Sequence, residues 1–185
     1  YCTKLGMKVT RSKLSGCLII EPEIFYDDRC FFQATFSESK YASIGIDLPF
    51  VQDNHSRSKK GVLRGLHYQK NKPQGKLVRV ARGSVYDVAV DIRPNSPTYG
   101  EWEGVELSDE NKCQLWIPPG FAHGFVVLSD IVDFEYKCTD YYDPKDNGII
   151  HWNDPDLGIT WPENIQITTS ERDTNAPSFR SLRAL

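Results

Sequence analysis

The stretch from residue 76 to residue 92 decides the fold class. It reads Lys76-Leu-Val-Arg-Val-Ala81, then Arg82-Gly83-Ser84, then Val85-Tyr-Asp-Val-Ala-Val-Asp-Ile92. Apolar and polar residues alternate in both outer segments, which is the period of a half-buried β-strand, and the Gly-Ser pair between them favours a turn. We therefore predict a β-hairpin with one face turned to solvent or to a ligand.

Further short strands follow this stretch. Residues 114–117, 124–128 and 133–139 have strand composition, and Pro118-Pro119-Gly120 closes the first of them. Strands separated by turn residues at a spacing of roughly ten residues are typical of a β-sandwich or barrel. Helical periodicity is weak. Residues 37–43 form the best helix candidate, and short turns are expected in the proline-rich tail from residue 154.

The chain has the size of one domain, with 185 residues, 39% apolar and 25% charged. Residues 1–6 precede Met7, which reads like a natural start, so we expect an upstream extension followed by one domain over residues 7–185. No secretion signal follows Met7 and no apolar run is long enough for a membrane helix, which predicts a cytoplasmic protein without membrane contact. The five cysteines are odd in number and form no C-x-x-C, so we expect them to be reduced.

The charges are distributed unevenly. Residues 54–86 hold nine of the 22 Lys and Arg and none of the 25 Asp and Glu, although the net charge is −3. A solvated basic face is one reading of this run. A nucleic-acid partner is disfavoured because the isoelectric point is near 5.8 and no recognition motif is visible. A compact cationic region in an acidic protein fits better with capture of a small polyanion such as a diphosphate.

The histidines limit the possible metal chemistry. Metal-dependent cupins bind their ion with an H-x-H pair on one strand plus a carboxylate and a distant histidine. Here His67 is followed two places on by Gln69. The best remaining ligand set would combine His67 with His123 and a carboxylate, so a reaction without metal or cofactor is preferred. In Arg64-Gly65-Leu66-His67 the cation and the base lie on opposite faces of a flat strand, but a bulge at Gly65 could turn both inward.

Five spaced motifs carry a family resemblance. They are Arg64-Gly-Leu-His-Tyr68, Gly83-Ser-Val-Tyr-Asp-Val88, Asp91-Ile-Arg-Pro-Asn-Ser-Pro-Thr98, Pro119-Gly-Phe-Ala-His-Gly-Phe125 and Tyr136-Lys-Cys-Thr-Asp-Tyr-Tyr142. Together they resemble the dTDP-4-dehydrorhamnose 3,5-epimerase family, in order, from about residue 7 to residue 179. The resemblance implies a double-stranded β-helix of the cupin (jelly-roll) type. It also implies an enzyme that epimerises C3, C5 or both of a nucleotide-linked 4-keto-6-deoxysugar for surface polysaccharides such as lipopolysaccharide.

The resemblance also implies catalytic roles. His67 resembles the general base and Asp173 the carboxylate that orients it, while Lys76 resembles the cation that stabilises the enolate. Tyr136 resembles the acid that protonates the opposite face of the sugar, a role for which Tyr141 and Tyr142 are competitors. A neutral imidazole fits the role of base because its pKa lies near neutral pH.

The resemblance implies a set of binding residues as well. Arg64 resembles the diphosphate clamp, and Arg29 resembles an arginine contributed across the interface of a homodimer. The other substrate-binding positions are Gln52, Asp53, Asn54, His123 and Arg172.

The sequence departs from the family pattern at two acidic positions. Ala34, in Arg29-Cys-Phe-Phe-Gln-Ala34, and Asn147 stand where the family carries glutamates. Without these two glutamate carboxylates the nucleotide is not determined, so a CDP-linked sugar is an alternative to a dTDP-linked one. In the other alternative, Gln33 or a residue of a neighbouring chain replaces the lost carboxylate acceptor. A metal-dependent cupin and a non-catalytic module that binds sugar nucleotides are more distant alternatives. The joint presence of His67, Tyr136 and Asp173 argues against the module.

Overall fold

The computed structural model describes residues 2–4 and 6–184. Strands dominate this part of the chain. In chain order the elements are β1 (Cys2–Lys4), β2 (Met7–Arg11), β3 (Leu18–Glu21), β4 (Ile24–Asp27), β5 (Cys30–Gln33), α1 (Glu38–Ala42), β6 (Gln52–Lys59), β7 (Leu63–Gln69), β8 (Lys76–Arg82), β9 (Ser84–Asp91), β10 (Trp102–Ser108), β11 (Gln114–Ile117), β12 (Phe121–Val127), β13 (Ile131–Cys138), β14 (Asn147–Ile149), α2 (Glu171–Thr174) and the 3₁₀ helix η1 (Phe179–Ala184).

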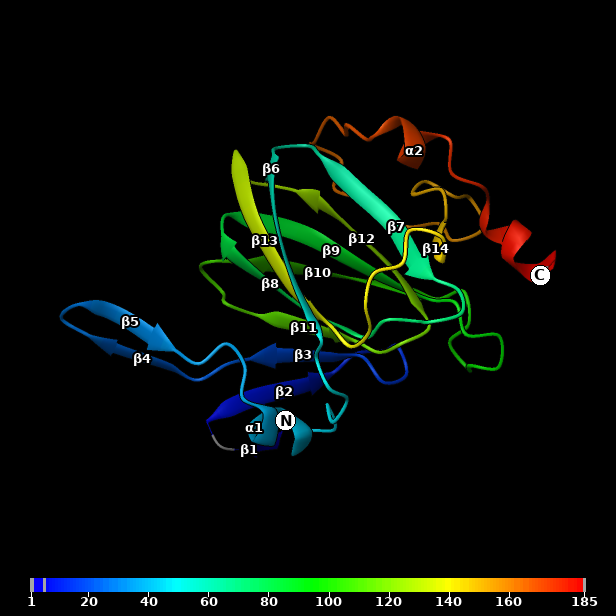
Figure 1. Ribbon diagram of the computed structural model, residues 1–185. Coiled ribbons are helices and arrows are strands. Elements are labelled where there is room, and N and C mark those ends of the chain that lie inside the picture. The colour runs from blue at the N-terminus through cyan, green and yellow to red at the C-terminus, as the bar shows by residue number, and fades with distance from the viewer. Residues whose placement is uncertain (1, 5, 185) are drawn as a thin grey trace.

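Two antiparallel sheets form the body of the molecule. The large sheet has the strand order β1-β2-β3-β11-β8-β13-β6, and the small sheet has the order β10-β9-β12-β7-β14. Strands β4 and β5 form a separate hairpin that extends away from the body, and α2 lies beside β7 at the opposite side (Figure 1). The predicted all-β, cupin-type double-stranded β-helix with a few short helices is confirmed.

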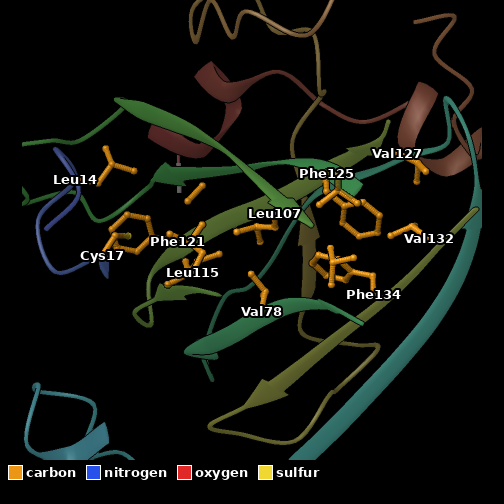
Figure 2. Packing of buried hydrophobic residues seen from close by; sticks show 14 residues of the cluster. Leu14, Cys17, Val78, Leu107, Leu115, Phe121, Phe125, Val127, Val132 and Phe134 are labelled. Carbon is orange, nitrogen blue, oxygen red and sulfur yellow. The ribbon is translucent and has the colours of Figure 1, made fainter. Parts of the chain in front are cut away.

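The main core lies between the two sheets. Val78 of β8 and Phe134 of β13 face Phe125 of β12 in one cluster of buried side chains, which Figure 2 shows from close by. A second cluster covers the other face of the small sheet, where Val88 and Val90 of β9 pack with residues of the C-terminal tail. The small sheet is therefore buried on both faces, and this explains why every residue of β12 is buried.

The predicted hairpin over residues 76–92 is wrong, although both of its strands exist. β8 pairs with β11 and β13 in the large sheet, whereas β9 pairs with β10 and β12 in the small sheet. The chain crosses from one sheet to the other at Gly83, where φ is +81°. Val78 and Val85 belong to the same core cluster, so each strand turns one apolar face to the space between the sheets. Alternation of this kind looks the same in a hairpin and in a crossover.

The other helix and strand predictions agree closely with the structure. The helix expected over residues 37–43 is α1, and the three predicted strands are β11, β12 and β13 with ends shifted by at most three residues. Residues 2–4 form β1, which pairs with β2, while Tyr1 and Leu5 of the expected extension lie outside the described residues. Cys17, Cys30, Cys113 and Cys138 carry free thiols. None of the described helices is long and apolar enough to cross a bilayer.

Candidate active site

The site is centred on His67 of β7. Opposite this strand, β12 pairs Phe125 with Arg64 and His123 with His67, so one residue of β12 faces two of β7 and a bulge forms at Gly65. At Gly65 φ is +134°, and an added Cβ would lie 2.5 Å from the Cα of Gly124. Glycine is therefore required on steric grounds. As predicted, the bulge turns Arg64 and His67 into the same cavity.

His67 and Asp173 form a hydrogen-bonded pair. The Nε2 atom of His67 lies 2.7 Å from the carboxylate of Asp173, and the two side chains are 36% and 6% exposed. Ser170 caps α2, because its Oγ accepts a hydrogen bond from the backbone N–H of Asp173 at 3.1 Å. Burial acts to raise the pKa of Asp173, but the bonds from His67, Ser170 and the Gly65 backbone outweigh it, and the pKa lies below its ordinary value. In the tautomer that carries its proton on Nε2, His67 donates this hydrogen bond to the carboxylate and the lone pair of Nδ1 is left unprotonated.

His123 forms a second pair with Asp87 of β9. Its Nε2 lies 2.8 Å and 3.0 Å from the two carboxylate oxygens, and both residues are buried. His123 is the direct cross-strand neighbour of His67, so the two rings project from the same face of the small sheet. Burial lowers the pKa of His123 despite the opposing effect of Asp87.

Lys76 and Tyr136 approach from the large sheet. Tyr136 belongs to the same face of β13 as Phe134, and the Nζ of Lys76 lies 6.0 Å from the centre of the Tyr136 ring. Burial lowers the pKa of Lys76, although Cys138 and Asp87 act in the opposite direction. Burial raises the pKa of Tyr136, so its hydroxyl keeps its proton at neutral pH.

Two cavities that share lining residues bring these groups together. A cavity of about 300 Å³, which we call the active-site cavity, contains His67, Lys76 and Tyr136, and a smaller one of about 150 Å³ reaches from the same three residues to His123 and Arg64. The remaining lining residues of the active-site cavity are Gln52, Asn54, Tyr68, Gln69, Gln74, Tyr142, Asn147 and Arg172. No described lining residue of this cavity is an aspartate or glutamate. Its lining carries positive charge from Lys76 and Arg172.

Arg64 and Arg172 differ from Arg57 and Arg79 in their partners. Arg57 pairs with Asp133 and Arg79 with Glu135, both from β13. By contrast, the hydrogen bond that Arg64 donates is to the Ser58 hydroxyl, at 3.1 Å. Within the described residues neither Arg64 nor Arg172 forms an ion pair with a carboxylate, so their charges are available to an anionic ligand. The basic run of residues 54–86 is thus divided between the cavity and the outer surface.

Three of the predicted binding residues belong to β6, and the structure separates them. Gln52 and Asn54 line the active-site cavity and are joined by a hydrogen bond of 2.9 Å. Asp53 lies on the opposite face of the strand, where it pairs with Lys137 at 2.9 Å. It lines a second cavity of about 300 Å³, which shares Asn54 and Tyr136 with the active-site cavity but does not include His67. Within this chain, Asp53 is therefore not brought to His67.

Arg29 is also remote from His67 within the chain. The hairpin of β4 and β5 extends away from the body of the molecule (Figure 1). Arg29 lies between these two strands, and its side chain is 89% exposed and paired with Asp27. An arginine in this position reaches an active site only if that site belongs to another molecule.

The described residues contain no group of three or more His, Cys, Asp and Glu side chains that could hold a metal ion. The carboxylates near His67 and His123 are Asp173 and Asp87, and each faces one imidazole in a separate pair. The arrangement can abstract a proton at one side of a ligand, donate one from the other, and stabilise a developing oxyanion with Lys76.

Sequence reasoning missed several residues of the site. Asp87 was part of a recognised motif but received no role, although a charged residue in the middle of an apolar strand signals a buried partner. Gln69, Gln74 and Tyr68 carry no such signal, because polar residues near strand ends are common on surfaces.

The comparisons with known proteins agree on one family. Residues 11–181 match the family model of dTDP-4-dehydrorhamnose 3,5-epimerase. The chain is 54% identical over 172 residues to the dTDP-4-dehydrorhamnose 3,5-epimerase of Methanothermobacter thermautotrophicus, covering 92% of this chain and 93% of that protein. It is also 54% identical over 169 residues to the enzyme of the same name from Escherichia coli, covering 90% and 91%. The crystal structure of the Legionella pneumophila dTDP-6-deoxy-D-glucose-3,5-epimerase in complex with dTDP-4-keto-L-rhamnose superposes with a TM-score of 0.92 at 53% identity, covering 97% of this chain and 94% of that one. The chain therefore belongs to the dTDP-4-dehydrorhamnose 3,5-epimerase family and is an epimerase.

Proposed function

We propose that the protein inverts both C3 and C5 of a dTDP-linked 4-keto-6-deoxyglucose, on the route to a rhamnose-like sugar of a surface polysaccharide. The observation that carries the proposal is the convergence of the His67–Asp173 pair, Lys76 and Tyr136 on one cavity from two facing sheets. An inverting epimerase needs a base and an acid on opposite sides of the carbon, and facing sheets supply them.

The reaction follows from the acidity of carbons next to a ketone. Nδ1 of His67 removes the proton from C5 or C3, and the electron pair of the broken C–H bond moves onto the C4 oxygen to give an enolate. Lys76 donates a hydrogen bond to this oxygen, a contribution of about 3 to 4 kcal/mol for one well-placed donor. Tyr136 then protonates the carbon from the opposite face. His67 loses its proton to solvent, Tyr136 regains one, and the cycle repeats at the second carbon.

Exchange with heavy water tests the proposal. Incubation of the protein with dTDP-4-keto-6-deoxyglucose in deuterium oxide should place one deuterium at C3 and one at C5, detected by NMR and mass spectrometry. Deuterium at one carbon alone would identify a single-position epimerase, and none at either carbon would contradict the proposed function. Chelators should leave the rate unchanged, because no step requires a metal.

A CDP-linked sugar is the second candidate substrate. The observation that favours it is that no described lining residue of the cavity is a carboxylate, since Asn147 replaces a family glutamate and, with its amide oxygen turned towards Arg172, accepts a hydrogen bond at 2.9 Å. A carboxylate suits the N3–H of thymine and repels the N3 lone pair of cytosine, so its loss reduces discrimination between the two bases. Measured kcat/KM values for matched dTDP- and CDP-linked sugars decide between them. A preference for dTDP above about a hundredfold, or roughly 2.7 kcal/mol, would exclude the CDP-linked substrate.

We further propose a cytoplasmic homodimer in which Arg29 of each subunit reaches the site of its partner. The β4–β5 hairpin supports this proposal, because it exposes 54% of Phe25, 72% of Tyr26, 48% of Phe31 and 69% of Phe32. Four exposed aromatic side chains on two strands are characteristic of a protein interface. The residues flanking Arg29 would then anchor the hairpin on the second subunit.

A further inference from the structure

Two loops complete the wall of the active-site cavity. Residues 70–75 connect β7, which carries His67, to Lys76 at the start of β8. Residues 139–146 connect β13, which carries Tyr136, to Asn147 at the start of β14. Gln74 of the first loop, Tyr142 of the second and Asn147 all line the cavity. The two sheets alone therefore do not enclose the substrate, and the positions of these loops matter for binding.

Direct hydrogen bonds join the two loops where they enter the large sheet. The side chain of Gln74 donates to the backbone carbonyl of Asp140 at 2.7 Å. Gly75 donates to the Thr139 hydroxyl at 2.8 Å and accepts from the Thr139 backbone at 3.0 Å.

Asp146 joins the loops at their other end. Its side chain accepts hydrogen bonds from the backbone N–H of Asn71 at 2.9 Å, the backbone N–H of Lys72 at 2.8 Å and the Asn71 amide at 2.7 Å. The residue is 6% exposed. Burial by itself raises the pKa of Asp146, but these donors outweigh it and hold the pKa below its ordinary value, so the carboxylate is ionised at neutral pH. Hydrogen bonds to an ionised group are stronger than neutral ones.

Asp146 is not among the residues that line the active-site cavity, whereas its neighbour Asn147 is. We propose that Asp146 is a positioning residue for substrate binding, because its carboxylate fixes the loop of residues 70–75 against the loop of residues 139–146. It thereby sets the places of Gln74, Tyr142 and Asn147 in the cavity wall. The predicted effect on substrate binding rests on the proposed function. The contact between the two loops can be tested without substrate.

Asp146→Asn tests the inference, with Asp91→Asn as a matched control. Asp91 is also a buried carboxylate that fixes a loop, through the backbone and guanidinium of Arg93 and the hydroxyls of Ser96 and Thr98, and it does not line the active-site cavity. We expect Asp146→Asn to raise KM by about tenfold or more and to change kcat by less than about threefold, because the strands bearing His67, Lys76 and Tyr136 keep their own sheet pairings. Asp91→Asn should lower the melting temperature while changing KM by less than about threefold. An unchanged KM for Asp146→Asn, or an equal rise for Asp91→Asn, would overturn the inference.

Amide hydrogen exchange separates failure of this inference from failure of the proposed function. In the absence of substrate, Asp146→Asn should accelerate exchange at the amides of Asn71 and Lys72, and Asp91→Asn should not. Unchanged exchange at these amides contradicts the loop contact even in an active enzyme. A wild-type protein that incorporates no deuterium into the sugar contradicts the proposed function instead. In that case the inference survives only if dTDP alone binds more weakly to Asp146→Asn than to wild type.

Discussion

Tyr136 and His67 approach the cavity from different sheets, and this separation allows the two half-reactions to be uncoupled. In the proposed mechanism, Tyr136→Phe retains the base His67 and its partner Asp173, so proton removal continues while proton delivery from the opposite face fails. We expect deuterium to enter the sugar without inversion, because His67 returns a solvent-derived deuteron to the face from which it removed the proton. NMR of the product measures both quantities in one experiment. Inversion at the wild-type rate would assign the acid role to Tyr141, Tyr142 or water.

The charge of Lys76 predicts an alkaline limit to activity. Burial lowers the pKa of Lys76, so the cation is lost at a lower pH than the ordinary lysine value of about 10.4. As pH rises through this lowered pKa, the enolate loses its donor and the rate of deuterium incorporation should fall. Deprotonation of Tyr136 does not account for this fall, because burial raises its pKa.

Lys76→Arg provides the control for this assignment. Arginine stays charged throughout the range, so the variant should be slower at neutral pH but its alkaline limit should move to higher pH. The measurement is the initial rate of exchange from neutral pH to just above the ordinary lysine pKa of about 10.4. An alkaline limit that does not move in Lys76→Arg would contradict the role of Lys76.

At the scale of the element, the bulge in β7 places both Arg64 and His67, and Gly65 makes it possible. Gly65→Ala puts a Cβ 2.5 Å from the Cα of Gly124 at a φ of +134°. We expect a loss of about 3 kcal/mol of unfolding free energy, because the backbone of β12 must move as well. Urea unfolding measures the effect.

Gly45→Ala is the matched control for this prediction. Gly45 also has a positive φ, +96°, but an added Cβ has nothing within 4 Å. We therefore expect Gly45→Ala to lower the free energy of unfolding by only about 1 kcal/mol, which is the conformational cost of a positive φ for alanine. Equal losses in the two variants would show that backbone conformation, and not the close approach of β7 and β12, dominates at Gly65.

At the scale of the whole molecule, the proposed homodimer predicts complementation between two inactive variants. His67→Ala lacks the base, and Arg29→Ala lacks the arginine offered to the partner. In a mixed dimer the site on the Arg29→Ala subunit has its own His67 and receives Arg29 from the other subunit, so one of the two sites is intact. Equal mixing after unfolding and refolding should restore about a quarter of wild-type activity, because half of the dimers are mixed. Activity no higher than that of the separate variants would contradict the contribution of Arg29 across the interface.

The strands and the helix α1 were predictable from the sequence because they depend on local order along the chain. Alternation with a period of two marks a strand wherever one face is buried, and turn residues mark its ends. The sequence also allowed a bulge at Gly65, because a glycine in a strand tolerates such an irregularity. The proposed catalytic residues His67, Lys76, Tyr136 and Asp173 were assigned through the family motifs and not through any local signal.

Strand pairing was decided by the tertiary structure alone. The same alternation in residues 76–92 fits a hairpin and a crossover between sheets, because it reports which face of a strand is buried and not which strand lies beside it. The contact between His67 and Asp173 joins residues 106 positions apart, and the contact between His123 and Asp87 joins adjacent strands of one sheet. The structure also places Asp53 on the outer face of β6 and Arg29 at the end of an extended hairpin. A sequence specifies the chemistry and the local backbone of each residue, whereas distances between strands are set by how two sheets pack around a shared core.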